Sequence, residues 1–242
     1  MGNFPHVFLL SSRDIMKNQF SRAGFIGYSL FLIAISALMT VLFYHIFIFK
    51  SFSSAGEREA TFIELTAEQA KNSPIPFKGN SIVEVMSYGC HYCAANEENV
   101  AKMVKNLPEG TEFAVIHLSK EGSFLASYAS VFATLEEMGI EKQWRDAIYN
   151  SVITRGLNLA DDAVLEEWLV KNGISVEKYM AARQSQGAKN RLKTMSAITE
   201  YYKINATPSF IVNKRYLLTQ EGTFAEFAEK LTKLMQKDEQ NP

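Results

Sequence analysis

The feature that most constrains this chain is an uncharged, apolar run near its N-terminus. No charged residue occurs from Ala23 to Phe49. At a rise of about 1.5 Å per residue, these roughly 27 residues would span about 40 Å as a helix, more than the hydrocarbon core of a bilayer at about 30 Å. The run is apolar on all sides, whereas a surface helix of a globular domain has a polar face. The sequence therefore predicts a transmembrane helix at residues 23–49.

Two alternatives remain for this run, a cleaved signal peptide and a buried core helix. The apolar part of a signal peptide is usually about 7–15 residues long and is followed by a small-x-small cleavage site. The run here is longer, and Ser53-Ser54-Ala55-Gly56 provides only a poor site of that kind. Core helices are also usually shorter than this run. We therefore expect an anchor that the chain retains.

Basic residues around the run indicate its orientation. Arg13, Lys17 and Arg22 precede it, whereas Lys50 and Arg58 follow it. The side of a membrane with more basic residues is normally the cytoplasmic side. We expect residues 1–22 to be a cytoplasmic segment, residues 50–60 a linker and residues 61–238 an exported domain.

The part of the chain after the run has the composition of one soluble domain. About 190 residues remain, which is enough for a single core, with or without an insertion. The formal net charge is −1, so nothing suggests a basic face for nucleic acid. Only two cysteines occur, three positions apart, and so short a loop gains little from a disulfide. This shifts the interpretation of the pair toward redox chemistry or metal binding.

The order of predicted elements is typical of an α/β fold with a helical insertion at about residues 122–203. Apolar, β-branched segments predict strands at residues 61–65, 81–87, 113–118, 209–213 and 215–219. Helical spacing predicts helices at residues 67–72, 90–107, 124–137, 142–154, 161–171 and 224–235, with two more pieces within 176–202. Glycines separate the helices of the insertion, at Gly139, Gly156, Gly173 and Gly187. We expect Trp144 and Trp168 to be anchors of its core.

Cys90 and Cys93 form a Cys-X-X-Cys motif where a predicted strand meets a predicted helix. The first cysteine would lie at the helix N-terminus, where free backbone N–H groups and the helix dipole favour negative charge. The thiolate is the attacking form of cysteine, and a second thiol nearby can resolve a mixed disulfide. The motif therefore predicts Cys90 as the nucleophile and Cys93 as the resolving residue of a redox-active disulfide.

Other interpretations of the pair fit the sequence less well. A c-type haem site needs histidine directly after the second cysteine, but position 94 is alanine. Structural zinc needs four ligands, and no second Cys-X-X-Cys occurs. The histidines that could supply the missing zinc ligands are His6, His45, His91 and His117. A purely structural disulfide also remains an alternative. We expect no metal and no cofactor.

Three residues near the pair are further candidates. Glu84 is an acid inside an apolar strand, six residues before Cys90. Burial would raise its pKa and let it exchange protons with the Cys93 thiol; the alternative is an acid at a sheet edge. His91 as an imidazolium would lower the thiol pKa of Cys90, unless it simply faces solvent. We expect Tyr92 at the rim, where substrates would dock.

From about Ser81 to its C-terminus, the chain resembles the thioredoxin superfamily and specifically its DsbA-like branch. The resemblance rests on Ser81–Cys93, on the helical insertion and on the segment Thr207-Pro208-Ser209-Phe210-Ile211-Val212-Asn213. In that family the proline is cis and packs beside the active-site disulfide, and the residue before it contacts substrate backbone. The resemblance implies these roles for Pro208 and Thr207, although a proline between helix and strand is also a natural break. The family's buried acid resembles Glu84 in position.

Two departures concern the direction of electron flow. The inner pair of the motif is His91-Tyr92, where the best-known oxidases of the family have Pro-His. Thr207 stands where those oxidases commonly have valine, and resembles the isomerase and reductase relatives. These differences leave the thioredoxin-like fold and the dithiol chemistry as expected, and leave open whether the pair oxidises or reduces its substrates.

The sequence therefore predicts a membrane-anchored thiol–disulfide oxidoreductase that forms or exchanges disulfides. The expected partners are exported proteins with cysteines and a membrane redox partner, either a quinone-linked oxidant or a thiol-supplying reductant. We expect a monomer in the bacterial inner membrane, with its catalytic domain in the periplasm. The rival hypothesis is a non-enzymatic, membrane-anchored binding or assembly module with the same fold, which would not need Cys90.

Overall fold

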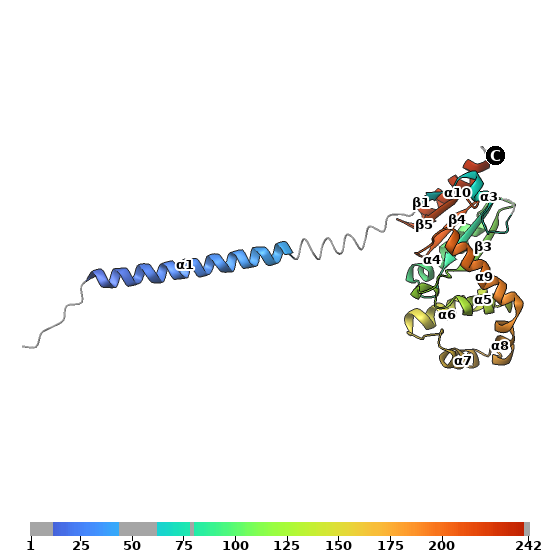
Figure 1. Ribbon diagram of the computed structural model, residues 1–242, viewed down its shortest axis with the longest axis horizontal. Coiled ribbons are helices and arrows are strands. Elements are labelled where there is room, and N and C mark those ends of the chain that lie inside the picture. Colours follow the sequence, from blue (N-terminus) through green and yellow to red (C-terminus); the bar gives the residue numbers. More distant parts are fainter. Residues whose placement is uncertain (1–11, 44–61, 78–79, 240–242) are drawn as a thin grey trace, which may run out of the picture. The chain divides into compact units, whose positions relative to one another are not determined.

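The structure is a computed structural model that describes residues 12–43, 62–77 and 80–239 (Figure 1). It divides into two units, one ending at Glu59 and the other beginning at Ala60. The predicted linker at residues 50–60 and the last part of the predicted membrane run, residues 44–49, lie outside the described residues.

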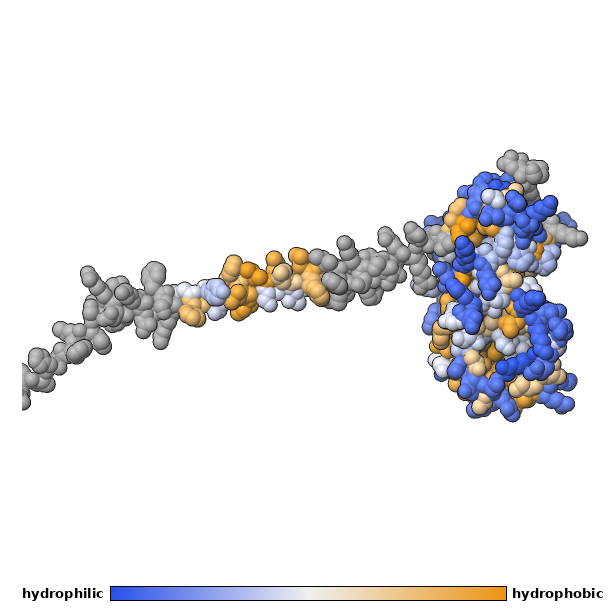
Figure 2. Space-filling model, in the orientation of Figure 1, coloured by the Kyte–Doolittle hydropathy of each residue, from blue (hydrophilic) through white to orange (hydrophobic). Residues whose placement is uncertain are grey.

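The described part of the first unit is one long helix, α1 (Ser12–Phe43). Within it, Gly24–Phe43 is long and apolar enough to cross a membrane. Its side chains are exposed, and Figure 2 shows that much of its surface is hydrophobic. The helix starts before the apolar run, because residues 12–22 are also helical. A signal sequence near an N-terminus can also meet this criterion of length and composition.

A five-stranded sheet forms the centre of the second unit. Its strands are β1 (Phe62–Glu64), β2 (Ser81–Met86), β3 (Glu112–His117), β4 (Ser209–Val212) and β5 (Tyr216–Thr219). They lie in the order β1-β5-β4-β2-β3. β2 pairs parallel with β3, and the other pairs are antiparallel. Strand β2 is therefore flanked on both sides, and all six of its residues are buried.

Helices cover both faces of the sheet. Because side chains alternate along a strand, Ile82, Glu84 and Met86 share one face of β2. On that face Ile82 packs with residues of α4 (His91–Lys105) and α10 (Phe224–Glu239). Val83 and Val85 face the other way and pack with the end of α9 (Gln186–Tyr201). The helix that begins beside Cys90 therefore lies over the same face as Glu84.

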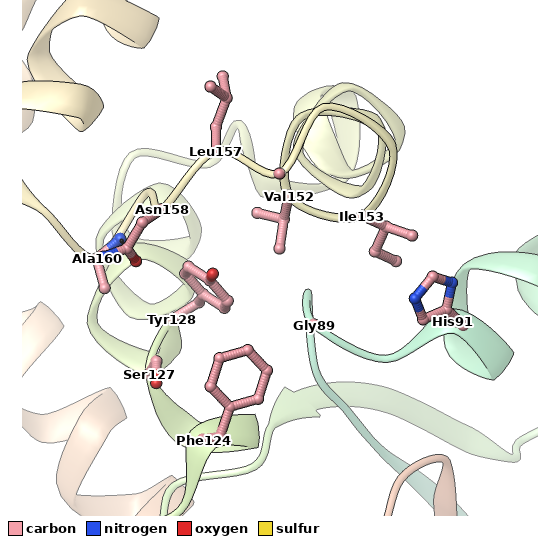
Figure 3. A pocket seen from close by; sticks show the side chains of 11 residues that line it. Gly89, His91, Phe124, Ser127, Tyr128, Val152, Ile153, Leu157, Asn158 and Ala160 are labelled. Carbon is pink, nitrogen blue, oxygen red and sulfur yellow. Dashed lines mark hydrogen bonds between the residues drawn. The ribbon is translucent and has the colours of Figure 1, made fainter.

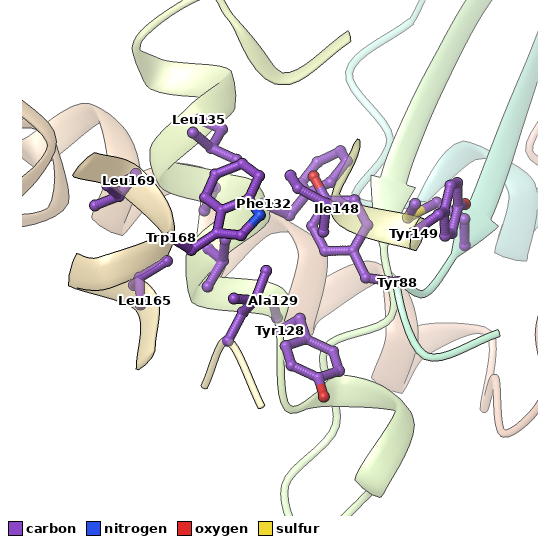
Figure 4. Close-up of a cluster of buried hydrophobic side chains, with 14 of the residues drawn as sticks. Tyr88, Tyr128, Ala129, Phe132, Leu135, Ile148, Tyr149, Leu165, Trp168 and Leu169 are labelled. Carbon is purple, nitrogen blue, oxygen red and sulfur yellow. The ribbon is translucent and has the colours of Figure 1, made fainter. Parts of the chain in front are cut away.

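The helical insertion lies between β3 and β4. Its elements are the 3₁₀-helix η2 (Phe124–Ala126), α5 (Ala129–Glu137), α6 (Glu141–Tyr149), the π-helix η3 (Asn150–Thr154), α7 (Asp162–Lys171), α8 (Val176–Gln184) and α9. The short helix α3 (Ala67–Lys71) precedes β2. Figure 4 shows the core of the insertion, in which Phe132, Ile148 and Trp168 pack together with Tyr88. The same cluster contains Cys93, so this core is continuous with the site of the cysteine pair.

The two tryptophans differ in depth. Trp168 is buried and its Nε1–H donates to Ser151 Oγ at 2.8 Å. Trp144 is half-buried and meets the Trp168 ring edge-on, with centroids 5.9 Å apart. Trp168 is a core residue as predicted, whereas Trp144 forms part of the outer layer of this core.

The structure corrects three boundaries in the insertion. The helix predicted at residues 124–137 is divided into η2 and α5, and the one predicted at 142–154 ends as the π-helix η3. Gly187 lies inside α9, where Ser185 ends α8 and caps α9 by accepting the Ala188 N–H at 3.0 Å. Apolar spacing does not distinguish an α-helix from a π-helix. A serine N-cap can begin a new helix at a point where the sequence has no glycine.

Candidate active site

A short, hydrogen-bonded turn connects β2 to α4. The Cys90 N–H donates to the Ser87 carbonyl at 2.9 Å, and the Gly89 N–H donates to Ser87 Oγ at 3.1 Å. The Ser87 hydroxyl donates in turn to the Leu125 carbonyl at 2.6 Å. Since Ser87 is fully buried, these bonds set where the strand ends and where Cys90 begins the helix.

A buried histidine holds the same turn from β3. The Tyr88 N–H donates to His117 Nε2 at 3.1 Å, and His117 Nδ1 lies 2.8 Å from the Leu118 carbonyl oxygen. A carbonyl accepts only, so Nδ1 carries the hydrogen and Nε2 is the acceptor. Burial lowers the pKa of His117 to about 4, which keeps the ring neutral near pH 7. The sequence pattern around His117 does not predict this role in the turn.

Cys90 and Cys93 are joined in a disulfide at the start of α4. Cys90 is the N-cap residue, and the Cys93 N–H donates to Cys90 Sγ at 3.1 Å. The first-turn N–H groups and the dipole of this 15-residue helix favour negative charge on that sulfur. Cys90 is 5% exposed and Cys93 is 1% exposed, so Cys90 is the sulfur that an incoming thiol can reach more readily.

The Thr207–Pro208 segment lies against the same sulfur. Its peptide bond is cis, as the family resemblance implied. The Thr207 carbonyl oxygen lies 3.3 Å from Cys90 Sγ, and both residues of the segment are buried. The structure therefore brings together three sequence-predicted residues, Cys90, Thr207 and Pro208.

Glu84 is buried in the inner strand β2, not at a sheet edge. It is 2% exposed, and its Oε2 has no hydrogen-bond partner among the described residues. Its strand neighbours are Val115 in β3 and Phe210 in β4, which are both apolar. Burial and, next, the charge of Glu97 raise the pKa of Glu84 to about 8. This acid therefore keeps its proton near pH 7.

A buried ion cluster adjoins the site, and sequence reasoning did not find it. Arg145 of α6 contacts Glu141 through Nε at 2.9 Å and through Nη2 at 2.5 Å, and its Nη1 contacts Glu97 of α4 at 2.8 Å. The Tyr88 hydroxyl donates to Glu141 Oε1 at 2.8 Å. The four-residue spacing of Glu141 and Arg145 is a detectable signal for a helical pair. The link to Glu97 depends on tertiary packing.

His91 and Tyr92 lie at the surface. Tyr92 is 64% exposed, and His91 is exposed at the edge of a pocket of about 500 Å³. Figure 3 shows His91 on one side of the Gly89 turn and Phe124 and Tyr128 on the other. The positions suit the predicted rim, while an electrostatic role for His91 stays a prediction.

The raised pKa of Glu84 predicts how stability depends on pH. Between pH 4.5 and about 8 the folded state keeps the Glu84 proton, whereas the unfolded chain loses it, so stability falls as pH rises. Glu84→Gln has no such proton to lose. Its free energy of unfolding, relative to that of the wild type, should therefore increase by roughly 2–5 kcal/mol from pH 4.5 to pH 8.5. Urea unfolding across this range measures the difference. The exposed-site variant Glu166→Gln is the control, and a pH-independent effect of Glu84→Gln would contradict the burial argument.

Comparison with known proteins identifies the family. The sequence model of the family described as DSBA-like thioredoxin domain matches residues 81–232. The thiol:disulfide interchange protein DsbA of Pseudomonas syringae pv. tomato is 24% identical over 156 residues, which is 64% of this chain and 71% of that protein. The DsbA of Azotobacter vinelandii is 27% identical over 135 residues, covering 56% and 63%.

Solved structures agree with this assignment at the level of the fold. The crystal structure of Pseudomonas aeruginosa DsbA has a TM-score of 0.64 at 22% identity, covering 74% of this chain and 93% of that one. The oxidoreductase NmDsbA1 of Neisseria meningitidis has a TM-score of 0.61 at 20% identity, covering 76% and 96%. With its Cys90–Cys93 pair at the start of the helix, the chain belongs to the DSBA-like thioredoxin domain family and is a thiol–disulfide oxidoreductase.

Proposed function

We propose that the chain oxidises the thiols of exported proteins by giving up its Cys90–Cys93 disulfide. This direction of electron flow, from the client to the cysteine pair, rests on the position of Cys90 Sγ. That sulfur accepts a hydrogen bond from the Cys93 N–H at the start of α4. Groups that stabilise the Cys90 thiolate lower the free energy of the reduced protein and make its disulfide a stronger oxidant. The relatives named thiol:disulfide interchange protein DsbA support exchange between thiols and disulfides.

The exposure of the two sulfurs suggests the order of steps. A client thiolate attacks Cys90 Sγ, the Cys90–Cys93 bond breaks, and the electron pair passes to Cys93. A second client thiolate then attacks the client sulfur of the mixed disulfide, and Cys90 leaves as a thiolate. The client loses two electrons and two protons and gains a disulfide, while the cysteine pair becomes reduced.

Glu84 is our candidate for the donor of the proton that Cys93 requires in the first step. Cys93 would leave as a thiolate in an apolar interior, where an unpaired charge is costly. Glu84 lies in β2 under α4, is protonated near pH 7, and is as deeply buried as Cys93. We propose that it donates its proton to Cys93 as the disulfide opens and takes the proton back when the pair is reoxidised.

The surroundings of Cys90 suggest how a client binds. The Thr207 segment is our candidate for contact with the client backbone, since its carbonyl lies beside Cys90 Sγ. The exposed Tyr92 and His91, which directly follow Cys90, would form the rim of the client-binding site. We propose that Pro208 keeps this segment against the disulfide.

We further propose that α1 anchors the enzyme in the bacterial inner membrane. The uncharged span Gly24–Phe43 supports an anchor, and the basic residues that precede it support a cytoplasmic N-terminus. The catalytic domain would then act in the periplasm, and the reduced pair would be reoxidised by a membrane partner, with a quinone-linked oxidant as the natural electron acceptor.

Removing the resolving cysteine should capture clients covalently. In Cys93→Ser, the Cys90 thiolate can still attack a disulfide of a client, but no second thiol of this chain can release the adduct. We expect adducts that disappear on reduction, detected by non-reducing electrophoresis and mass spectrometry. The variant with both cysteines replaced by serine is the control. Equal adducts in the control, or none in Cys93→Ser, would contradict the assigned roles.

Equilibration with glutathione tests the direction of electron flow. If the pair is an oxidant, its reduction potential should lie closer to about −120 mV, as for strongly oxidising dithiols, than to about −270 mV, as for thioredoxin. The fraction of disulfide can be measured by thiol labelling at a series of glutathione ratios. A potential near the thioredoxin value would favour the second candidate function, a reductant supplied with electrons by a membrane partner, for which Thr207 is the supporting residue.

A further inference from the structure

The buried charges beside the cysteine pair do not balance. Among the described residues, Glu97 and Glu141 both contact Arg145, and the charges of these three residues act on Glu84. The side chain of Arg145 is 9% exposed and that of Glu141 is 0% exposed, whereas Glu97 is 27% exposed. Ionised Glu84 would place a further negative charge in this interior with no contacting base, and its Oε2 has no hydrogen-bond partner among the described residues, so the proton remains on Glu84.

The helical insertion supplies the base of this cluster. Arg145 belongs to α6, and its partner Glu97 lies on α4, one helical turn after Cys93. Glu141 accepts three hydrogen bonds from the Arg145 guanidinium and one from the Tyr88 hydroxyl. The guanidinium is therefore held directly by Glu141 and Glu97, and Tyr88 in turn holds Glu141.

We propose that Arg145 is a positioning residue for the proton of the dithiol reaction: its charge, fixed between Glu141 and Glu97, sets the pH range over which Glu84 can supply a proton to Cys93. The proposal rests on the proposed role of Glu84. Arg145 does not touch the reacting sulfurs, and it acts by opposing the negative charges that surround the Glu84 carboxyl.

Each charged group near Glu84 favours either the protonated or the ionised form of its carboxyl. Glu97 and Glu141 favour the protonated form of Glu84, and Arg145 favours the ionised form. Tyr149 of α6 is a further neighbour, and its hydroxyl has no hydrogen-bond partner among the described residues. Tyr149 stays neutral because burial raises its pKa well above the usual value. From β3 and β4, Glu84 meets only Val115 and Phe210 across the ladder.

Two variants that break the same ion pair should therefore shift the Glu84 titration in opposite directions. Arg145→Met removes the positive charge and should raise the midpoint, whereas Glu97→Gln removes a negative charge and should lower it, each by about one pH unit. The midpoint can be read from the ¹³C-labelled Glu84 carboxyl in the oxidised protein. If Arg145 were only a structural tie between α6 and α4, the two variants would instead agree in sign or shift nothing, and either result overturns the proposal.

The functional readout is the rate at which a thiolate opens the disulfide, corrected for thiolate concentration at each pH. This rate should fall as Glu84 loses its proton, at a higher pH in Arg145→Met and at a lower pH in Glu97→Gln. Both shifts should vanish in the Glu84→Gln background. If Glu84→Gln leaves the profile unchanged, the role of Glu84 fails, and Arg145 with it. Capture of clients by Cys93→Ser would still decide the oxidoreductase function separately.

The control and the backup variant follow from the structure. Arg183→Met breaks another ion pair of the insertion, the one with Asp162, where the side chains are 30% and 68% exposed, and should leave the midpoint unchanged. Arg145→Met strands the Glu141 carboxylate and can unfold the domain, which circular dichroism would show. In that case Arg145→Lys, which keeps the charge, must stay near the wild-type midpoint while Glu97→Gln lowers it. No shift in Glu97→Gln would overturn the proposal.

Discussion

The start of helix α4 at Cys90 is the constraint on which the rest of the site depends. Burial of all of β2 determines where the strand ends, and the bonds of Ser87 determine how the chain turns. The Tyr88 N–H bond to a neutral His117 holds the turn from the neighbouring strand. Cys90 Sγ consequently lies at the free N–H groups of the helix, where a thiolate is stabilised. A sulfur one turn further along α4 would have no such environment.

The site also contains buried ionisable side chains close to the cysteine pair. The fold places Glu84 in the middle of the inner strand β2, and the apolar residues opposite it, Val115 and Phe210, provide no compensating charge. The helical insertion covers this region and brings an arginine with it. A buried ion cluster contributes little net stability on general grounds. Its presence beside the cysteine pair is better explained by the protons and charges that the reaction moves.

The parts of the site that the sequence predicted are those encoded locally. The strand, turn and helix around Cys90 have their own residue patterns, and the Thr207-Pro208 pair was identified through the family resemblance. The missing parts join residues that are distant in sequence: Tyr88 and His117 are separated by 29 positions, and Glu97 and Arg145 by 48. No periodicity encodes such contacts. The π-helix η3 was missed for a different reason, since apolar spacing alone does not distinguish it from an α-helix.

The start of α4 is expected to hold the reduced Cys90 as an anion. The most direct test is the reactivity of the reduced protein toward iodoacetamide as a function of pH, with Cys93→Ser used to assign the signal to Cys90. We expect a thiol pKa for Cys90 well below the ordinary value of about 8.5. If Cys90 instead titrates at about 8.5, the helix start has no chemical effect on the sulfur, and Cys90 is not held as an anion.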